Sequence, residues 1–232
     1  MNLQQRVAQI NYDRTPLFQG RAGEIVHEFL DKFKETRSTD VEWAFRNEDK
    51  HWLGSVALDR ASLSWEASTD RAGFLTNAIQ LFERVESTFE LQAPFRRVGY
   101  RVIALQETES FEKARDMILS SLMRPHMGDW SPLNVGPDDL HITLEWGGTK
   151  QEPGRRIIVA PVRKEEPSIR SGMLAFPDAV EVENAILLDI DAWHVNQDEF
   201  KRPLRELSRQ VEELCADIDE KWFAGGSASN GT

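Results

Sequence analysis

Two arginines on one predicted strand have the chemistry of an anion site. In the segment 95–103, the alternation of a β-strand places Arg97, Gly99 and Arg101 on one face. A guanidinium group is a rigid fork of N–H donors that suits a phosphate or a carboxylate, and a glycine lets a ligand approach the backbone. Arg97 and Arg101 are therefore candidates for binding a ligand or a partner.

Two aspartates on a later predicted strand offer a structural alternative. Asp189 and Asp191 share one face of the segment 185–195. If the two strands are neighbours, Arg101 pairs with Asp189 or Asp191 across the sheet and stabilises the fold, and we favour this interpretation. Two carboxylates are too few for a metal site, because Ca²⁺ takes about six or more oxygen ligands. No metal and no other cofactor is expected.

A histidine and a threonine form a third candidate site. The segment 140–144 reads L-H-I-T-L and resembles the H-x-T-hydrophobic motif of two-histidine phosphoesterases, whose two side chains bind phosphate. That chemistry needs the motif twice, and none of the other histidines begins a second copy. His141 is therefore interpreted as a partly buried strand histidine. The alternative is a phosphate-handling enzyme or small anionic ligand binder that uses His141, Thr143, Arg97 and Arg101.

Seven tryptophans are many for a chain of 232 residues. Most lie in predicted strands or on a helix stripe, where packing in the core is the ordinary role of a large aromatic side chain. Trp130 differs, because it lies in a loop rich in proline and glycine. It is either tucked beneath that loop or offered to a partner, and it is a further candidate contact.

Composition and charge narrow the classes of function. Lys and Arg total 28 and Asp and Glu total 39, a formal net charge of −11. A nucleic-acid partner is not expected, because such binding needs a basic field. No apolar run approaches the roughly 20 residues that span a bilayer, so a membrane partner is not expected either. Cys215 is the single cysteine, so no intramolecular disulfide can form and a cytoplasmic location is expected.

Familiar catalytic signatures are absent from the sequence. It contains no P-loop, no G-x-G-x-x-G, no C-x-x-C and no H-E-x-x-H segment. A non-catalytic binding or interaction protein, with another protein as its partner, is therefore the preferred function. The oligomeric state is not indicated.

Hydrophobic periodicity predicts the elements that position these residues. Apolar residues at spacings of three and four predict four helices, and alternation predicts eight strands. A long loop is expected at 123–137, and an irregular stretch follows the seventh strand. The helices are expected over 25–33, 70–89, 111–122 and 200–222, and the strands over 3–12, 41–46, 52–58, 62–67, 95–105, 140–146, 156–162 and 185–195.

Both halves of the chain repeat one order of elements: strand, helix, antiparallel strands and long helix. This order predicts an α+β fold built from a duplicated unit, in which the long helix covers the apolar face of its sheet. Each half is expected to resemble a TATA-binding-protein-like or a helix-grip-like unit. The first repeat is placed at 1–93, the second, with loop insertions, at 94–224, and a disordered tail at 225–232.

Two motifs resemble a sporadically distributed, functionally uncharacterised bacterial protein family. Arg97-Val98-Gly99-Tyr100-Arg101 matches the family's R-[I/V]-G-[L/Y]-R strand. The segment 187–193 matches its later apolar D-x-D strand, which a terminal helix follows. The resemblance covers about residues 40 to 223 and implies a bacterial setting and no established reaction.

Overall fold

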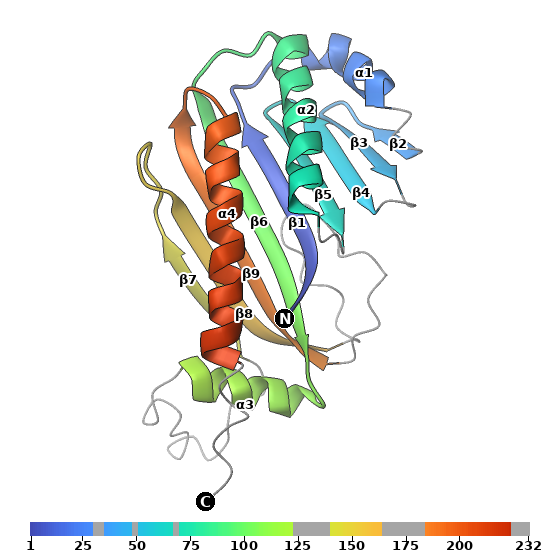
Figure 1. Cartoon of the computed structure of the whole chain (residues 1–232). Coiled ribbons are helices and arrows are strands. Elements are labelled where there is room, and N and C mark those ends of the chain that lie inside the picture. Colours follow the sequence, from blue (N-terminus) through green and yellow to red (C-terminus); the bar gives the residue numbers. More distant parts are fainter. Residues whose placement is uncertain (30–34, 48–50, 67–69, 123–139, 164–183, 224–232) are drawn as a thin grey trace, which may run out of the picture.

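One antiparallel sheet of nine strands organises the part of the chain that the structure describes (Figure 1). The structure is a computed structural model, and it describes residues 1–29, 35–47, 51–66, 70–122, 140–163 and 184–223. The fold is of the mixed α+β class, as expected. Along the sheet the strands follow the order β2-β3-β4-β5-β1-β6-β9-β8-β7.

The two halves of the chain contribute neighbouring blocks of this sheet. The first block contains β1 (Asn2–Asn11), α1 (Phe18–Phe29), β2 (Glu35–Ser38), β3 (Glu42–Asn47), β4 (Trp52–Ala57), β5 (Arg60–Glu66) and α2 (Arg71–Phe89). The second contains β6 (Phe95–Glu107), α3 (Phe111–Leu122), β7 (Ile142–Trp146), β8 (Gly154–Arg163), β9 (Asn184–Gln197) and α4 (Lys201–Ile218), which a π-helical turn extends over Asp219–Phe223.

The long helices lie on the same face of the sheet, which we call the helix face. Helix α2 packs on β1 and β5, and α4 packs on β6 and β9 (Figure 1). Helix α1 contacts α2 and β3, whereas α3 contacts β8 and β9 near one end of the sheet. We call the opposite face of the sheet the far face.

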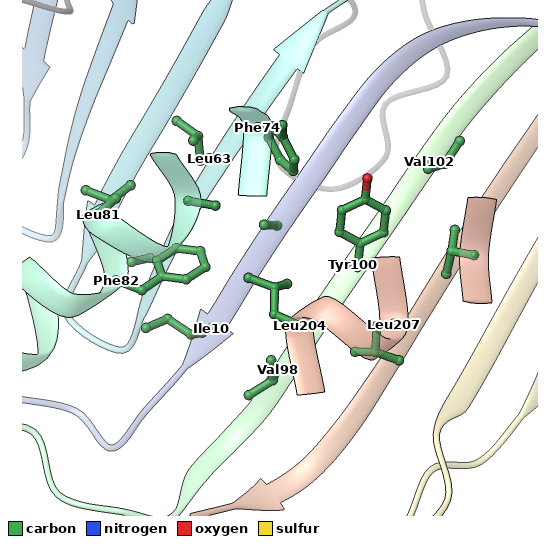
Figure 2. Close-up of a cluster of buried hydrophobic side chains, with 14 of the residues drawn as sticks. Ile10, Leu63, Phe74, Leu81, Phe82, Val98, Tyr100, Val102, Leu204 and Leu207 are labelled. Carbon is green, nitrogen blue, oxygen red and sulfur yellow. The ribbon is translucent and has the colours of Figure 1, made fainter. Parts of the chain in front are cut away.

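The main core fills the space between the sheet and these helices. Val98, Tyr100 and Val102 of β6 point to the helix face and are fully buried (Figure 2). They meet the apolar stripes of α2 and α4, including the fully buried Phe82 and Leu207. Because successive strand residues alternate between faces, the same register sends Arg97 and Arg101 to the far face.

Helix α4 buries most of the apolar stripe that the sequence predicts for residues 200–222. Phe200, Leu204, Leu207, Val211 and Ile218 are buried, because spacings of four and three keep them on the side that faces β6 and β9. Two members of the predicted stripe, Leu214 and Trp222, are only partly buried. The stripe is thus continuously buried from Phe200 to Val211 and interrupted at Leu214 and Trp222.

Two elements of the first half differ from the sequence-based expectation. Helix α1 begins at Phe18, before the expected start at residue 25, because packing of Phe18, Ile25 and Phe29 stabilises it despite two glycines of low helix propensity. Strand β2 was not predicted, since its residues E-T-R-S have no alternation, and its position comes from pairing with β3.

Several predictions concern residues outside the described ranges. They are the loop at 123–137 with Trp130, the irregular stretch from 164 to 183 and the tail at 225–232. None of the described helices is both long enough and apolar enough to span a bilayer.

Candidate functional site

Five charged residues gather on the far face where β6, β9 and β8 lie side by side. We call Arg97, Arg101, Arg156, Asp189 and Asp191 the charged cluster. The register pairs Arg101 with Asp191 and pairs Asp191 with Arg156, so one row of the sheet crosses the cluster. Three guanidinium groups and two carboxylates meet here, which leaves one excess positive charge in a chain of net charge −11.

The Arg101–Asp189 pair is the buried part of the charged cluster. Arg101 donates from Nε to Oδ1 of Asp189 at 2.6 Å and from Nη2 to Oδ2 at 2.5 Å. The side chain of Asp189 is only 4% exposed and that of Arg101 16%. This bidentate bond runs diagonally, because the residue directly opposed to Arg101 is Asp191. The geometry is that of a structural ion pair.

The Arg97–Asp191–Arg156 group is the more exposed part. Arg97 donates from Nη2 to both carboxylate oxygens of Asp191, at 2.8 and 2.7 Å, and Nη2 of Arg156 lies 3.6 Å from Oδ2. The two arginine side chains are 32% and 38% exposed, against 10% for Asp191. Each arginine also has a buried Nε with no hydrogen-bond partner among the described residues. Two cations therefore share one carboxylate and keep unused donors.

Gly99 makes room for Arg97 rather than for a ligand. A Cβ atom at Gly99 would lie 3.2 Å from Nε of Arg97, so the arginine side chain runs over the glycine to reach Asp191. The guanidinium carbon of Arg97 also lies 4.8 Å from the ring centroid of Trp193, a cation–π contact. Arg97 therefore covers the Gly99 backbone on this face, and Arg97 and Trp193 are the groups presented there.

Trp193 depends on a second glycine, which supplies a test of this packing. A Cβ atom at Gly154 would lie 2.5 Å from Cε2 of Trp193 and 2.7 Å from the backbone nitrogen of Gly148. We expect Gly154→Ala to cost about 1 to 3 kcal/mol of unfolding free energy in denaturant melts, because a crowded site must shift. Gly147→Ala is the matched control, since nothing lies within 4 Å of its Cβ position. Equal stability of the two variants would contradict this packing.

His141 and Thr143 lie apart from the charged cluster. His141 directly precedes β7, Thr143 lies on β7, and both are exposed. The strands β9 and β8 separate β7 from β6, which puts the β6 and β7 backbones about 14 Å apart at the usual strand spacing. The expectation that His141 is partly buried is wrong, because β7 is an edge strand. Thr143 shares the far face with its register partner Ile158, but β9 and β8 separate it from Arg97 and Arg101.

A second polar network lies on the helix face and was missed by the sequence interpretation. Arg6 donates from Nε to Glu212 of α4 at 2.8 Å, and the Tyr100 hydroxyl donates to the same carboxylate oxygen at 2.6 Å. Burial, reinforced by the Glu212 charge, raises the pKa of Tyr100, so the phenol remains a donor. An acidic helix such as α4 is ordinarily expected to turn its carboxylates to solvent. The signal for an inward Glu212 was Arg6, which alternates with the apolar residues Ala8 and Ile10.

His194 gives the fold a dependence on pH. Burial lowers the pKa of His194 from its usual 6.5, against the raising effects of Glu206 and a backbone bond to Thr149. The unfolded chain therefore binds more protons than the folded chain between the lowered pKa and about 6.5. Stability from this group is complete above pH 6.5 and is lost as the pH falls through this window. Denaturant unfolding measured between pH 7.5 and 5 should show that the His194→Asn variant loses less unfolding free energy on acidification than the parent protein. Equal losses in the two proteins would contradict the role of His194.

Comparison with known proteins adds no identification. No family model matches the chain, and no curated protein matches it. The resemblance of the Arg97–Arg101 strand to an uncharacterised bacterial family stays a prediction. Within the described ranges, no group of three or more His, Cys, Asp and Glu side chains is placed to hold a metal ion.

Proposed function

We propose that this protein is a non-catalytic binding protein that holds an acidic segment of a partner protein on the far face of its sheet. The contact residues are Arg97 and Arg156, with Trp193 beside them. The observation that carries the proposal is that two guanidinium groups share the single Asp191 carboxylate while about a third of each arginine side chain stays exposed. A bacterial cytosol is the proposed setting.

An acidic ligand supplies what this group lacks. Two guanidinium charges face one carboxylate, so a second carboxylate that reaches the exposed part of these side chains adds charge-assisted hydrogen bonds and balances the charge. The excess positive charge of the cluster favours an anion locally, although the whole chain carries −11. The exposure of Arg97 and Arg156, near one third each, leaves them accessible to a partner.

Binding fits this chemistry better than catalysis. Arginine stays protonated at all physiological pH values, so Arg97 and Arg156 cannot act as proton-transfer groups near pH 7. His141 and Thr143, the candidates for phosphate chemistry, lie on or beside β7, at the edge of the sheet. The arginines are thus suited to recognition, and recognition needs no further group in the cluster.

We also infer that the sheet arose by duplication of one α+β unit, with repeats at 1–93 and 94–224. The strand order supports this inference: the first strand of each half, β1 or β6, pairs with the last strand of its own half, β5 or β9. Each last strand leads into the long helix that packs on it. A TATA-binding-protein-like saddle fits this order, and its broad far face would be the binding surface.

The test uses a fluorescently labelled hexaglutamate peptide and measures its anisotropy with the purified protein. We expect saturable binding that Arg97→Ala weakens at least about tenfold, a change of roughly 1.4 kcal/mol. Arg96→Ala is the matched control, because it removes the same charge from the neighbouring, two-thirds exposed residue. Equal weakening by both variants, or no binding, would overturn the proposal. Competition with inorganic phosphate tests the small-anion alternative. That alternative is favoured if phosphate displaces the peptide with a dissociation constant lower than the peptide's own.

A further inference from the structure

The edge strand β7 leaves two large apolar side chains in solvent. Leu144 is 39% exposed and Trp146 is 50% exposed. Both point to the helix face, because their register partners are Ile157 and Arg155, on the side of β8 that joins the core at Ile157. Core packing was the expected role of Trp146, and this expectation is wrong. In Figure 1, β7 lies at the edge of the sheet, to the left of α4.

Two exposed carboxylates lie on the stripe of α4 that contacts Arg155 of β8. Gln210 of α4 accepts a hydrogen bond from Nη2 of Arg155 at 3.4 Å, and Arg155 is the register partner of Trp146. Glu206 and Glu213 stand one turn before and one turn after Gln210, on the same stripe of the helix. Both are exposed, and neither forms an ion pair within the part of the chain that the structure describes.

We propose that Leu144, Trp146, Glu206 and Glu213 form a docking surface for a basic amphipathic helix of a partner protein. We call these four residues the docking strip. Its apolar residues offer area to the apolar side of such a helix, and its carboxylates pair with Lys or Arg at the border. This surface lies on the helix face and is separate from the charged cluster.

The first half of the sheet shows why a helix is the fitting occupant. There, α1 lies beside α2 and contacts β3, whose Phe45 is buried. In the second half, no described helix takes the equivalent place beside α4 over β7, since α3 contacts β8 and β9. A partner helix on the docking strip would complete the same arrangement.

The charges favour a basic partner over a second copy of the chain. In a symmetric pair the same patch meets itself, so each docking strip would face the Glu206 and Glu213 of the other copy. Two chains of −11 would also repel one another before contact. A basic segment meets neither cost.

The test measures binding of a labelled 18-residue peptide of Leu and Lys with helical spacing. We expect Trp146→Ala and the double change Glu206→Gln/Glu213→Gln each to weaken binding at least about tenfold, with unfolding midpoints unchanged because the side chains are exposed. The controls are Val41→Ala, an exposed apolar residue near the other edge, and Glu107→Gln, an exposed carboxylate at the end of β6. Neither control variant should change the affinity for the peptide.

Three outcomes would overturn the inference. Equal losses in strip and control variants would show non-specific attraction of a cationic peptide. Tighter binding of a peptide with strictly alternating Leu and Lys would assign β7 to strand addition instead. A dimer in sedimentation that Trp146→Ala dissociates would assign the strip to a second copy. The Arg97→Ala variant leaves the docking strip intact. The effect of this variant on hexaglutamate binding therefore tests the far-face proposal independently of the docking strip.

Discussion

Replacing Asp189 by asparagine is expected to lower the free energy of unfolding by about 3 to 5 kcal/mol, the cost of breaking a buried ion pair from one side. Asp189 is 4% exposed and accepts both donors of the Arg101 fork. Without the carboxylate, a guanidinium group on a central strand loses its charged partner in a poorly hydrated site. Urea unfolding monitored by circular dichroism measures the loss.

An exposed ion pair made by another arginine of β6 controls for the loss of charge alone. Arg96 and Asp13 form an exposed ion pair, with side chains 66% and 79% exposed, and Asp13→Asn should cost less than about 1 kcal/mol. A double-mutant cycle of Arg101→Ala with Asp189→Asn should show strong coupling, since the residues touch. Additive effects would contradict the structural pairing, and an Arg101→Ala variant as stable as the parent protein would point to a ligand role.

Truncation of Leu207 to alanine is expected to cost about 2 to 5 kcal/mol, the range for a buried leucine. Leu207 is fully buried and packs between α4 and the sheet, near Tyr100 and Val98 (Figure 2). The cavity would open at the junction of α4 with β6 and β9, where little relaxation is possible.

Leu214 on the same helix is the matched control. It is only partly buried, so the same truncation should cost clearly less. Equilibrium unfolding of both variants in denaturant gives the comparison. A loss below about 0.5 kcal/mol for Leu207→Ala, the scale of surface changes, would mean that α4 does not cover the sheet as described.

Elements with strong periodicity could be predicted from the sequence, and elements held by tertiary contacts could not. The stripe of α4 and the alternation of β6 and β9 are local patterns of many residues, so burial follows from spacing. Strand β2 has four polar residues and exists through its pairing with β3. Helix α1 begins among glycines, and only its packing on α2 and β3 explains its start at Phe18.

The sequence predicts which face of the sheet each residue of the charged cluster occupies, but it does not predict which residues pair. Alternation alone assigned Arg97, Arg101, Asp189 and Asp191 to faces, but which arginine meets which aspartate depends on the offset between β6 and β9. Arg156 could not be added, because nothing local shows that β8 lies beside β9. The exposure of Trp146 likewise depends on β7 being the edge strand, which is a property of the whole sheet.

The most direct test of the binding proposal observes the arginine Nε–H groups themselves. In ¹H–¹⁵N correlation spectra, hexaglutamate peptide should shift the Nε–H signals of Arg97 and Arg156 along one saturable curve, because a carboxylate bound to the exposed part of each guanidinium changes the electric field at its Nε–H. The Nε–H of Arg6, which already donates to Glu212 beneath α4, should not move, and neither should that of the exposed Arg96. Shifts of all four signals together, or of none, would contradict an anion-binding site on the far face.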